Sequence, residues 1–330
     1  MAKRPGPAEE AWILKKAILI FVDGLGLGRP DPSVNPCAGD GLVFLNQHSG
    51  KRQPFALPLD GLGFGVDAAL GVSGLPQSAT GQTTLLTGVN CARLLGKHKP
   101  AFPNEPLRNI LKEKSLLKQI RDLGLKPSFI NAYRPLFFSL KEKTKWRLSA
   151  TTVANLAADL PFNRITDIGE GGALYHDMTN RSLRSQGFDA PVFSPEKAAG
   201  ILLQNTEHYH FILYEFFLTD RAGHTGEMDK ALPVLEVLDR FIGSVLKGID
   251  LRSTLVMITS DHGNVEDLST VTHTRNPAMT LVWGSGKEDM VSRVSCLDHI
   301  TPALIQWYRN SLNQRNSSYD TPSEDIAETG

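Results

Sequence analysis

Residues 15–23 read KKAILIFVD, a run of β-branched and apolar residues that ends in an acid and is followed by GLGLG at 24–28. A continuous apolar run of this length, bounded by glycines, is typical of a strand that is buried on both faces of a parallel sheet. Such a strand ends at the carboxyl edge of the sheet, where α/β proteins bind their ligands. The stretch therefore predicts a central strand with Asp23 at a candidate ligand-binding edge.

The same pattern recurs further along the chain, where stretches of helical apolar spacing alternate with apolar runs that end in polar residues. In chain order these are helix 107–123 and strand 127–133, helix 195–205 and strand 210–220, and helix 231–247 and strand 253–263. This alternation predicts an α/β fold with a doubly wound, mostly parallel sheet that is flanked by helices.

Two regions depart from the alternation. Residues 135–190 are rich in Lys, Arg and Thr and have weaker periodicity. We predict that they form a small cap inserted into a core of residues 1–134 and 191–312, although a merely irregular connection fits almost as well. Residues 313–330 contain few apolar side chains, which predicts a disordered tail.

Composition narrows the class of protein. The 35 Lys and Arg residues balance 35 Asp and Glu residues, so no overall field attracts nucleic acid or anionic lipid. The three cysteines form no CxxC pair, which argues against a disulfide framework or a thiolate zinc site. No apolar stretch reaches the roughly 18 residues that a membrane span needs. We expect a cytoplasmic protein that binds neither nucleic acid nor membrane, and the oligomeric state is not indicated.

Acids and imidazoles gather in segments at or beside the predicted strand ends. These segments are FVDG (21–24), PQSATGQTT (76–84), TDRAGHTG (219–226), TSDHGN (259–264) and THTRNP (272–277). Each one alone fits a capped turn as well as it fits a ligand set. Together they predict a metal site, because acids crowded into one crevice need cations to neutralise them, and Asp and His suit zinc or manganese.

Spacing supports part of this prediction. Asp220 and His224 are four residues apart, which places both on one side of a helical turn. Asp261 and His262 are adjacent and converge only where a strand turns into a loop. Glycines at 24, 26 and 28 invite a dinucleotide-binding interpretation, but their G-x-G-x-G spacing and the preceding acid argue against a nicotinamide site.

The motifs DGLGLG, SATGQTTLLTG, DRAGHTG, SDHGNVED and THTRNP occur in this order. They resemble the metal-binding core of the alkaline phosphatase superfamily, most closely the branch that holds cofactor-independent phosphoglycerate mutase and phosphopentomutase. The resemblance covers roughly residues 15–95 and 195–310. It implies an alkaline-phosphatase-like fold and a metalloenzyme that transfers phosphoryl groups.

The resemblance also implies roles for individual residues. One divalent metal ion, manganese or zinc, would be bound by Asp220, His224 and His273. A second would be bound by Asp23, Asp261 and His262, with Ser78 beside it as the nucleophile. The short stretch 259–276 would thus contribute ligands to both ions.

The local sequence around Ser78 fits the role of a nucleophile. Small residues precede the helical stretch TTLLTG, so Ser78 is predicted at a helix start, where backbone amides also favour a phosphate oxygen. An N-cap serine would occupy the same place. Thr80 is the rival nucleophile, but the resemblance places Ser78, three residues before Gly81, at the family's nucleophile position. Two ions close together would lower the pKa of its hydroxyl.

Two departures from the family bear on activity. Where mutases of this branch have Gly-His after the nucleophile, this chain has Gly81-Gln82. Phosphoglycerate mutases also insert a large second domain, whereas this chain has room for only a small cap. A mutase must retain its intermediate and exclude water, so we expect a two-metal phosphate-ester hydrolase. A phosphomutase of a sugar or acid phosphate is the alternative, and a non-catalytic metal-binding protein is the second alternative.

The expected substrate is a small phosphorylated metabolite, and cations outside the motifs are candidates to bind it. Lys97 and Arg134 are the leading ones, followed by Lys99 and Arg108. Each of them fits a solvated loop position at least as well.

Overall fold

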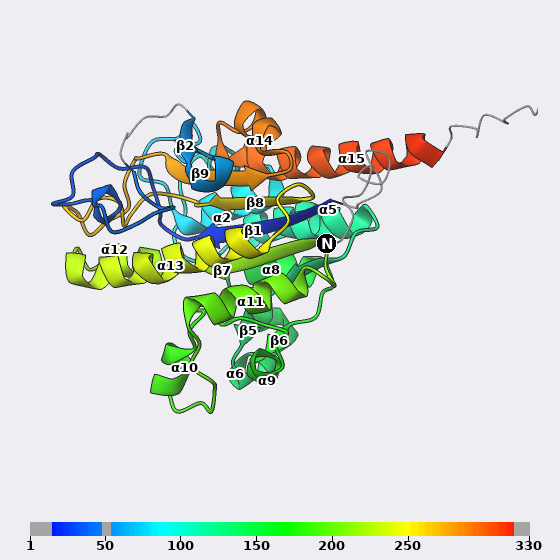
Figure 1. The fold of residues 1–330 in the computed structure, drawn as a ribbon, viewed down its shortest axis with the longest axis horizontal. Helices are drawn as coiled ribbons and strands as arrows, with labels where there is room; N and C mark the ends of the chain where they lie inside the picture. Colours follow the sequence, from blue (N-terminus) through cyan, green and yellow to red (C-terminus); the bar gives the residue numbers. More distant parts are fainter. Residues whose placement is uncertain (1–14, 48–53, 320–330) are drawn as a thin grey trace, which may run out of the picture.

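The computed structural model describes residues 15–47 and 54–319. In this part of the chain a seven-stranded sheet has the order β2-β3-β9-β8-β1-β7-β4. Its strands are β1 Lys16–Val22, β2 Phe55–Leu57, β3 Gly61–Val66, β4 Pro127–Phe129, β7 Phe211–Phe216, β8 Thr254–Thr259 and β9 Ala278–Gly284. Figure 1 shows β1, β7 and β8 side by side in the centre of the molecule.

The central strands run parallel. β1 pairs in parallel with β7 on one side and β8 on the other, and β4 pairs in parallel with β7. β9, β3 and β2 complete the sheet as an antiparallel edge. The predicted α/β fold with a mostly parallel sheet is confirmed. The antiparallel edge was not expected, because β2 and β3 are short and rich in glycine and give little hydrophobic pattern.

Helices cover both faces of the sheet. One face packs Leu19 and Phe21 against α2, α5 and α15, and the other packs Ile18 and Ile20 against α11 and α13. Helices on the first face are α2 Ser78–Thr87, α4 Glu105–Lys114, α5 Leu116–Asp122, α8 Ala150–Ala157, α14 Lys287–Arg293 and α15 Ile300–Tyr319. Those on the second are α11 Pro195–Asn205 and α13 Met228–Gly248. Alternate residues of β1 therefore serve two separate cores.

Shorter helices lie in the connections. They are η1 Pro36–Ala38, η2 Pro58–Asp60, η3 Leu297–His299, α3 Cys91–Leu95 and α12 Leu218–Gly223. Of these, α12 matters most for the site, because it begins two residues after β7 ends.

The predicted strand 127–133 is divided in two. β4 ends at Phe129, and Ala132–Tyr133 form β5, which pairs with β6 Asn163–Arg164 in a separate two-stranded sheet. Between β4 and β5, the side chain of Asn131 makes the hydrogen bonds to β7 that a strand backbone would otherwise make. Its Nδ2 donates to the Glu215 carbonyl at 2.8 Å, and its Oδ1 accepts from the Glu215 amide at 2.9 Å. The side chain of Asn131 thus redirects the chain out of the main sheet.

Residues 135–190, predicted as a cap, contain β6 and several short helices. The helices are α6 Pro135–Ser139, α7 Glu142–Lys145, α8, α9 Ile165–Gly169 and α10 Arg181–Ser185. α8 packs on α2, α4 and α5 in the main core, whereas Ile168, Tyr175 and Leu183 form a small cluster of their own. That the region acts as a cap stays a prediction.

The C-terminal helix continues further than expected. α15 extends to Tyr319, so the predicted disordered tail is wrong for residues 313–319. Low apolar content does not exclude a helix, because a helix can continue beyond the core that anchors its first turns. Residues 1–14, 48–53 and 320–330 of the predicted division lie outside the described residues. None of the helices in the described ranges is both long and apolar enough to span a membrane.

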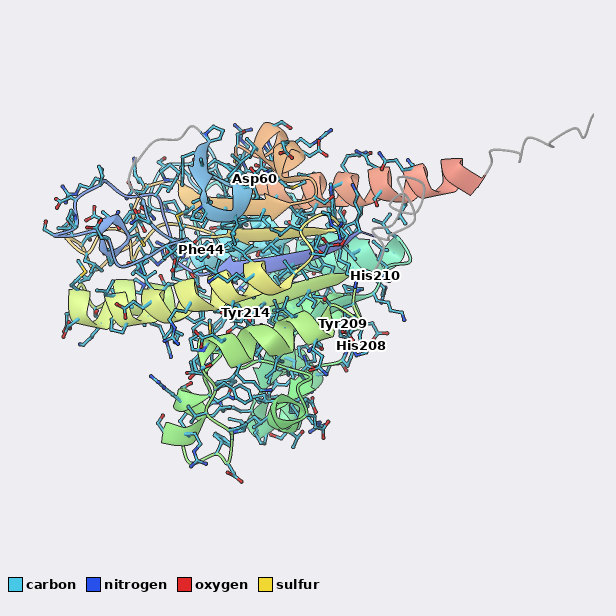
Figure 2. The ribbon with its side chains drawn as sticks, in the orientation of Figure 1. Phe44, Asp60, His208, Tyr209, His210 and Tyr214 are labelled. Atoms are coloured by element: carbon cyan, nitrogen blue, oxygen red, sulfur yellow. The ribbon has the colours of Figure 1, made fainter. Side chains whose placement is uncertain are left out.

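A hydrogen bond from β7 ties the region after α9 to the main core. Tyr214, labelled in Figure 2, is fully buried, and its Oη donates to the Tyr175 carbonyl at 2.9 Å. We expect Tyr214→Phe to lower the free energy of unfolding by about 0.5–1.5 kcal/mol, because the Tyr175 carbonyl loses one of its two donors and keeps the Met178 amide. The measurement is urea unfolding. The control is Tyr209→Phe, whose hydroxyl bonds no described residue; equal effects of the two changes would contradict the assignment.

Candidate metal centre

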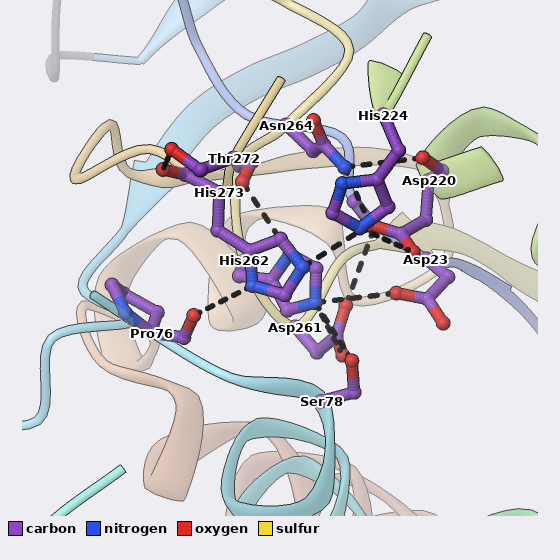
Figure 3. A network of polar contacts seen from close by, with 12 residues as sticks. Asp23, Pro76, Ser78, Asp220, His224, Asp261, His262, Asn264, Thr272 and His273 are labelled. Carbon is purple, nitrogen blue, oxygen red and sulfur yellow. Dashed lines mark hydrogen bonds and ion pairs between the residues drawn. The ribbon is translucent and has the colours of Figure 1, made fainter. Parts of the chain in front are cut away.

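Parallel strands bring the predicted ligands to one edge of the sheet. Asp23 follows β1, Asp261 and His262 follow β8, and Asp220 lies on α12 just beyond β7. The residues that Figure 3 shows converging are Asp23, Ser78, Asp220, His224, Asp261, His262 and His273. All the predicted metal ligands therefore lie in one cluster at the carboxyl edge.

The three imidazoles present the same nitrogen to the centre. Nδ1 of His224 lies 2.8 Å from the Val271 carbonyl, and Nδ1 of His273 lies 2.8 Å from the Pro76 carbonyl. A carbonyl only accepts, so each Nδ1 carries a proton and leaves Nε2 to face the cluster. This is the orientation in which histidines bind metal, with the outer nitrogen held by a second partner. His262 has a longer contact of the same kind, 3.4 Å to the Gly263 carbonyl.

Carboxylate oxygens surround these nitrogens. His262 Nε2 lies 3.3 Å from Asp23 Oδ1 and 3.4 Å from Asp261 Oδ2. Asp220 Oδ1 lies 3.4 Å from His273 Nε2, and Asp220 Oδ2 lies 3.4 Å from His224 Nε2. An unprotonated Nε2 and a carboxylate oxygen are both acceptors, so these contacts need a proton or a cation between them.

The pKa values of the clustered carboxyls and imidazoles are shifted because these side chains are buried close together. Burial, with the charge of Asp220 adding to it, raises the pKa of Asp261 to about 7. Burial and then Asp261 raise the pKa of Asp23 well above its usual value. Burial lowers the pKa of His262 to about 3, and His273 contributes. For Asp220, burial is outweighed by the His273 hydrogen bond and nearby imidazoles, so its pKa falls to about 2. The carboxyls resist joint ionisation unless a cation joins them.

Two buried oxygens of the cluster have no hydrogen-bond partner among the described residues: Asp23 Oδ1 and Asp261 Oδ2. Leaving buried carboxylate oxygens without partners is costly unless they bind a cation. The donor set of Asp oxygens and His nitrogens fits divalent metal ions such as manganese and zinc. The residues present thus fit the predicted metals.

The grouping of ligands differs in one respect from the prediction. Asp220, His224 and His273 bring ligand atoms within 4.8 Å of one another, as expected for the first ion. The second group within that limit is Asp23, Asp220 and His262. Asp261 lies beside it through the His262 contact. Asp220 therefore stands between the two groups, a position that residue spacing could not reveal.

Ser78 lies at the edge of the cluster. It is the first residue of α2, with Gln77 as the N-cap, and its Oγ is 3.1 Å from His262 Nε2. With Asp220, His224 and His273 it lines a cavity of about 370 Å³. The rival Thr80 is fully buried, and its hydroxyl donates to the Gln77 carbonyl and accepts from the Lys99 amide. Of the two hydroxyls, only Ser78 faces the cavity.

Comparison with known proteins matches parts of this chain to metalloenzymes. The Metalloenzyme superfamily model matches residues 152–307. The 2,3-bisphosphoglycerate-independent phosphoglycerate mutase of Desulforudis audaxviator is 27% identical over 121 residues, which is 35% of this chain and 24% of the relative. That of Mycoplasma mobile is 28% identical over 166 residues, 47% of this chain and 32% of the relative. The chain thus matches about a quarter to a third of the length of these relatives.

These matches support a metalloenzyme of the alkaline phosphatase superfamily that is related to the phosphoglycerate mutases. Its fold is similar to that of the PH0037 protein from Pyrococcus horikoshii, with a TM-score of 0.54, 17% identity, and coverage of 90% of this chain and 97% of that one. It is also similar to a Bacteroides thetaiotaomicron protein whose structure concerns glycosaminoglycan metabolism. The TM-score there is 0.52, with 12% identity and coverage of 94% and 74%. These two likenesses support the fold alone.

Gln82, the departure from the superfamily's mutase branch, contacts the metal cluster directly. Its Nε2 donates to Asp23 Oδ2 at 3.1 Å, and its side chain is buried. The Gln82 amide therefore orients a predicted metal ligand, at the position where mutases of this branch have a histidine.

The buried carboxylate of Glu266 holds the ligand-bearing loops together, a role that the sequence did not reveal. Its Oε2 accepts from the Gly26 amide at 2.8 Å and the Asn264 amide at 2.7 Å. Its Oε1 accepts from the Thr274 hydroxyl at 2.5 Å and the Asn276 Nδ2 at 3.0 Å. The loops after β1 and β8 and the His273 loop therefore share one anchor.

The position of the Glu266 carboxylate also explains why Gly26 and Gly263 have no side chain. A Cβ at Gly26 would lie 2.5 Å from Cδ of Glu266, and one at Gly263 would collide with both Glu266 and Thr274. The glycine at position 26, close to Asp23, thus leaves room for the Glu266 carboxylate. The glycines after β1 therefore need no dinucleotide to explain them.

The predicted substrate cations are scattered. Lys97 and Arg108 do not line the cavity over the cluster, whereas Pro100, next to Lys99, does. Arg134 lines a second cavity and donates to Gln186 Oε1 at 2.5 Å. Their role in substrate binding stays a prediction.

We expect Asp261→Asn to remove about one bound ion per chain while leaving the thermal stability of the metal-free protein unchanged or higher. The change removes one acid from a buried group of like charge and keeps an oxygen for the Gly24 amide, which lies 3.4 Å away. Elemental analysis and thermal unfolding at pH 8 check it. A clear fall in the unfolding temperature of metal-free protein would contradict the account.

We expect Glu266→Gln to lower the free energy of unfolding of metal-free protein by about 2–4 kcal/mol, because its NH₂ group would face other donors. Urea unfolding is the measurement. Glu236→Gln, an exposed position on α13, is the matched control and should change the value by less than about 0.5 kcal/mol. Equal effects of the two changes would show that Glu266 is not an anchor.

Proposed function

We propose that the protein is a two-metal phosphate-ester hydrolase that acts on a small phosphorylated metabolite through a phosphoserine at Ser78. The observation that carries the proposal is the position of Ser78. Its Oγ lies 3.1 Å from His262 Nε2, at the start of α2, and faces the same cavity as Asp220 and His273. A nucleophile and candidate metal ligands thus border one space.

Two divalent ions bound by these ligands would lower the pKa of a serine hydroxyl and stabilise charge on phosphoryl oxygens. In the first step Ser78 Oγ loses its proton and bonds to phosphorus, while the ester P–O bond breaks and the departing oxygen takes a proton. In the second step water adds to the phosphorus of phosphoserine, which releases inorganic phosphate and restores the hydroxyl. The amides at the start of α2 favour the phosphoryl oxygens in both steps.

Access of water favours hydrolysis over mutase activity. The side chain of His224 is 44% exposed, so solvent reaches one of the predicted metal ligands. A mutase must instead hold its dephosphorylated intermediate and exclude water. A phosphomutase remains the second candidate, because the matching relatives are phosphoglycerate mutases. It would share the first step and return the phosphoryl group to the substrate. A non-catalytic metal-binding protein is the third candidate.

We also propose manganese or zinc as the metal and the cytoplasm as the location. Asp and His ligands serve both ions. The cysteines at 37, 91 and 296 are free, and burial raises the pKa of Cys91 to about 11, which keeps this thiol protonated. Free, unreactive thiols suit a reducing compartment.

A panel of phosphorylated metabolites, supplied with manganese or zinc, tests the proposal by measuring both phosphate release and isomer formation. We expect phosphate release that is lost on chelation and is lowered roughly 10³-fold or more by Ser78→Ala, because the nucleophile is removed. Ser73→Ala, in an exposed loop, is the control.

Each other outcome points elsewhere. Isomer without free phosphate would favour the mutase. Full metal occupancy with no turnover of any ester would favour the non-catalytic protein. Activity that survives exhaustive chelation or Ser78→Ala would contradict the phosphoserine route.

A further inference from the structure

A second cavity lies beside the metal cluster and has a different character. Its volume is about 300 Å³, and its walls are largely apolar and aromatic, including Tyr133, Phe137, Leu148 and Phe217. An enclosure of about 150 Å³ holds one benzene ring, so this space accommodates one or two rings. In Figure 1 the elements that supply Tyr133 and Phe137, β5 and α6, lie below β7.

A buried carboxyl on β7 opens into this cavity. Glu215 is 8% exposed, and its Oε2 accepts from the Thr151 hydroxyl at 2.8 Å. Within the described ranges no hydrogen bond reaches its Oε1. Asn131 fixes the backbone of Glu215 through both the amide and the carbonyl. The cavity therefore presents a positioned oxygen that a hydrogen-bond donor can approach.

His176 adds a second unsatisfied polar atom to the wall. Its Nδ1 is buried without a hydrogen-bond partner among the described residues. Its ring stacks on Phe217, with centroids 4.3 Å apart and an angle of 28°. Burial lowers the pKa of His176 to about 4, so it is a neutral ring at physiological pH. An apolar wall with two unsatisfied polar atoms is typical of a ligand site.

The cavity adjoins the predicted metal ligands through two elements. Glu215 pairs with Phe21 of β1, and Asp23 follows two residues later, directly after the end of that strand. Strand spacing and rise place the Cα atoms of Glu215 and Asp23 roughly 8 Å apart. Phe217 lies one helical turn before Asp220 on α12. The cavity wall thus lies two or three residues from two of the predicted metal ligands, Asp23 and Asp220.

We infer that the cavity binds the leaving group of the substrate, and that this group is an aromatic or heteroaromatic ring bearing an O–H or N–H donor for Glu215. Stacking surfaces select the ring, the carboxyl selects the donor, and the volume limits its size. The inference deepens the proposed hydrolase activity and rests on it for the placement of the phosphate. It makes Glu215 and the aromatic wall determinants of specificity.

Kinetics with manganese-loaded protein test the inference. The probes are phenyl phosphate, 4-hydroxyphenyl phosphate and the ringless ethyl phosphate. We expect Leu148→Trp, which fills the cavity, to lower the ratio of kcat/KM for phenyl over ethyl phosphate at least tenfold. The control Leu94→Trp, at a 56% exposed position on α3, should leave this ratio unchanged.

A second variant addresses the carboxyl. We expect the wild type to prefer 4-hydroxyphenyl over phenyl phosphate about tenfold, and Glu215→Met, which cannot accept the donor in the same way, to abolish the preference. Thr151 keeps a partner in this variant, because its hydroxyl lies 3.0 Å from that of Ser149. Thermal unfolding confirms that the variant is folded, and an unchanged preference in folded Glu215→Met would overturn the role of Glu215.

Binding of phenylphosphonate, measured by calorimetry, separates the inference from the hydrolase proposal. If no ester is hydrolysed but phenylphosphonate binds the wild type at least tenfold more tightly than Leu148→Trp, the ring site stands and the hydrolase proposal fails. If esters are hydrolysed with ratios insensitive to Leu148→Trp, the ring site is overturned and the hydrolase stands. If phenylphosphonate binds neither form and no ester turns over, both are overturned.

Discussion

The arrangement of this site depends on the buried carboxylate of Glu266. It accepts hydrogen bonds from Gly26 and Asn264 through one oxygen and from Thr274 and Asn276 through the other. Three loops meet at this carboxylate: the loop after β1, the loop after β8 and the loop that bears His273. Without Glu266, no shared hydrogen-bond acceptor would hold them together. One anion fixes their mutual positions, and the glycines at 26 and 263 leave room for it.

Once these loops are fixed, the cluster is electrostatically incomplete. Imidazole Nε2 atoms lie 3.3–3.4 Å from carboxylate oxygens, while their Nδ1 atoms are engaged by carbonyls. Asp23 and Asp261 each retain a buried oxygen without a partner in the described part of the chain. Divalent cations would satisfy all of these atoms at once. The same edge of the sheet thus gathers the charge, the nucleophile and, through Glu215, a neighbouring apolar cavity.

Sequence patterns located the edge but not its internal geometry. Apolar runs that end in acids predicted β1, β7 and β8, and parallel strands bring such ends together, so the gathering of the candidate ligands at one edge was predictable. The antiparallel edge was not, because β2 and β3 are short and glycine-rich. The split of 127–133 depends on the Asn131 side chain, and the position of Asp220 between two ligand groups depends on rotamers. Contacts between residues distant in sequence, such as Glu266 with Gly26, leave no local periodicity to detect.

The central claim is that one anchored cluster binds two metal ions. Anomalous diffraction from crystals grown with manganese, recorded near the manganese edge, tests it most directly. We predict two peaks about 3.5–4 Å apart, one among Asp220, His224 and His273 and the other among Asp23, Asp261 and His262. A single peak, or none, at full manganese saturation would contradict the claim.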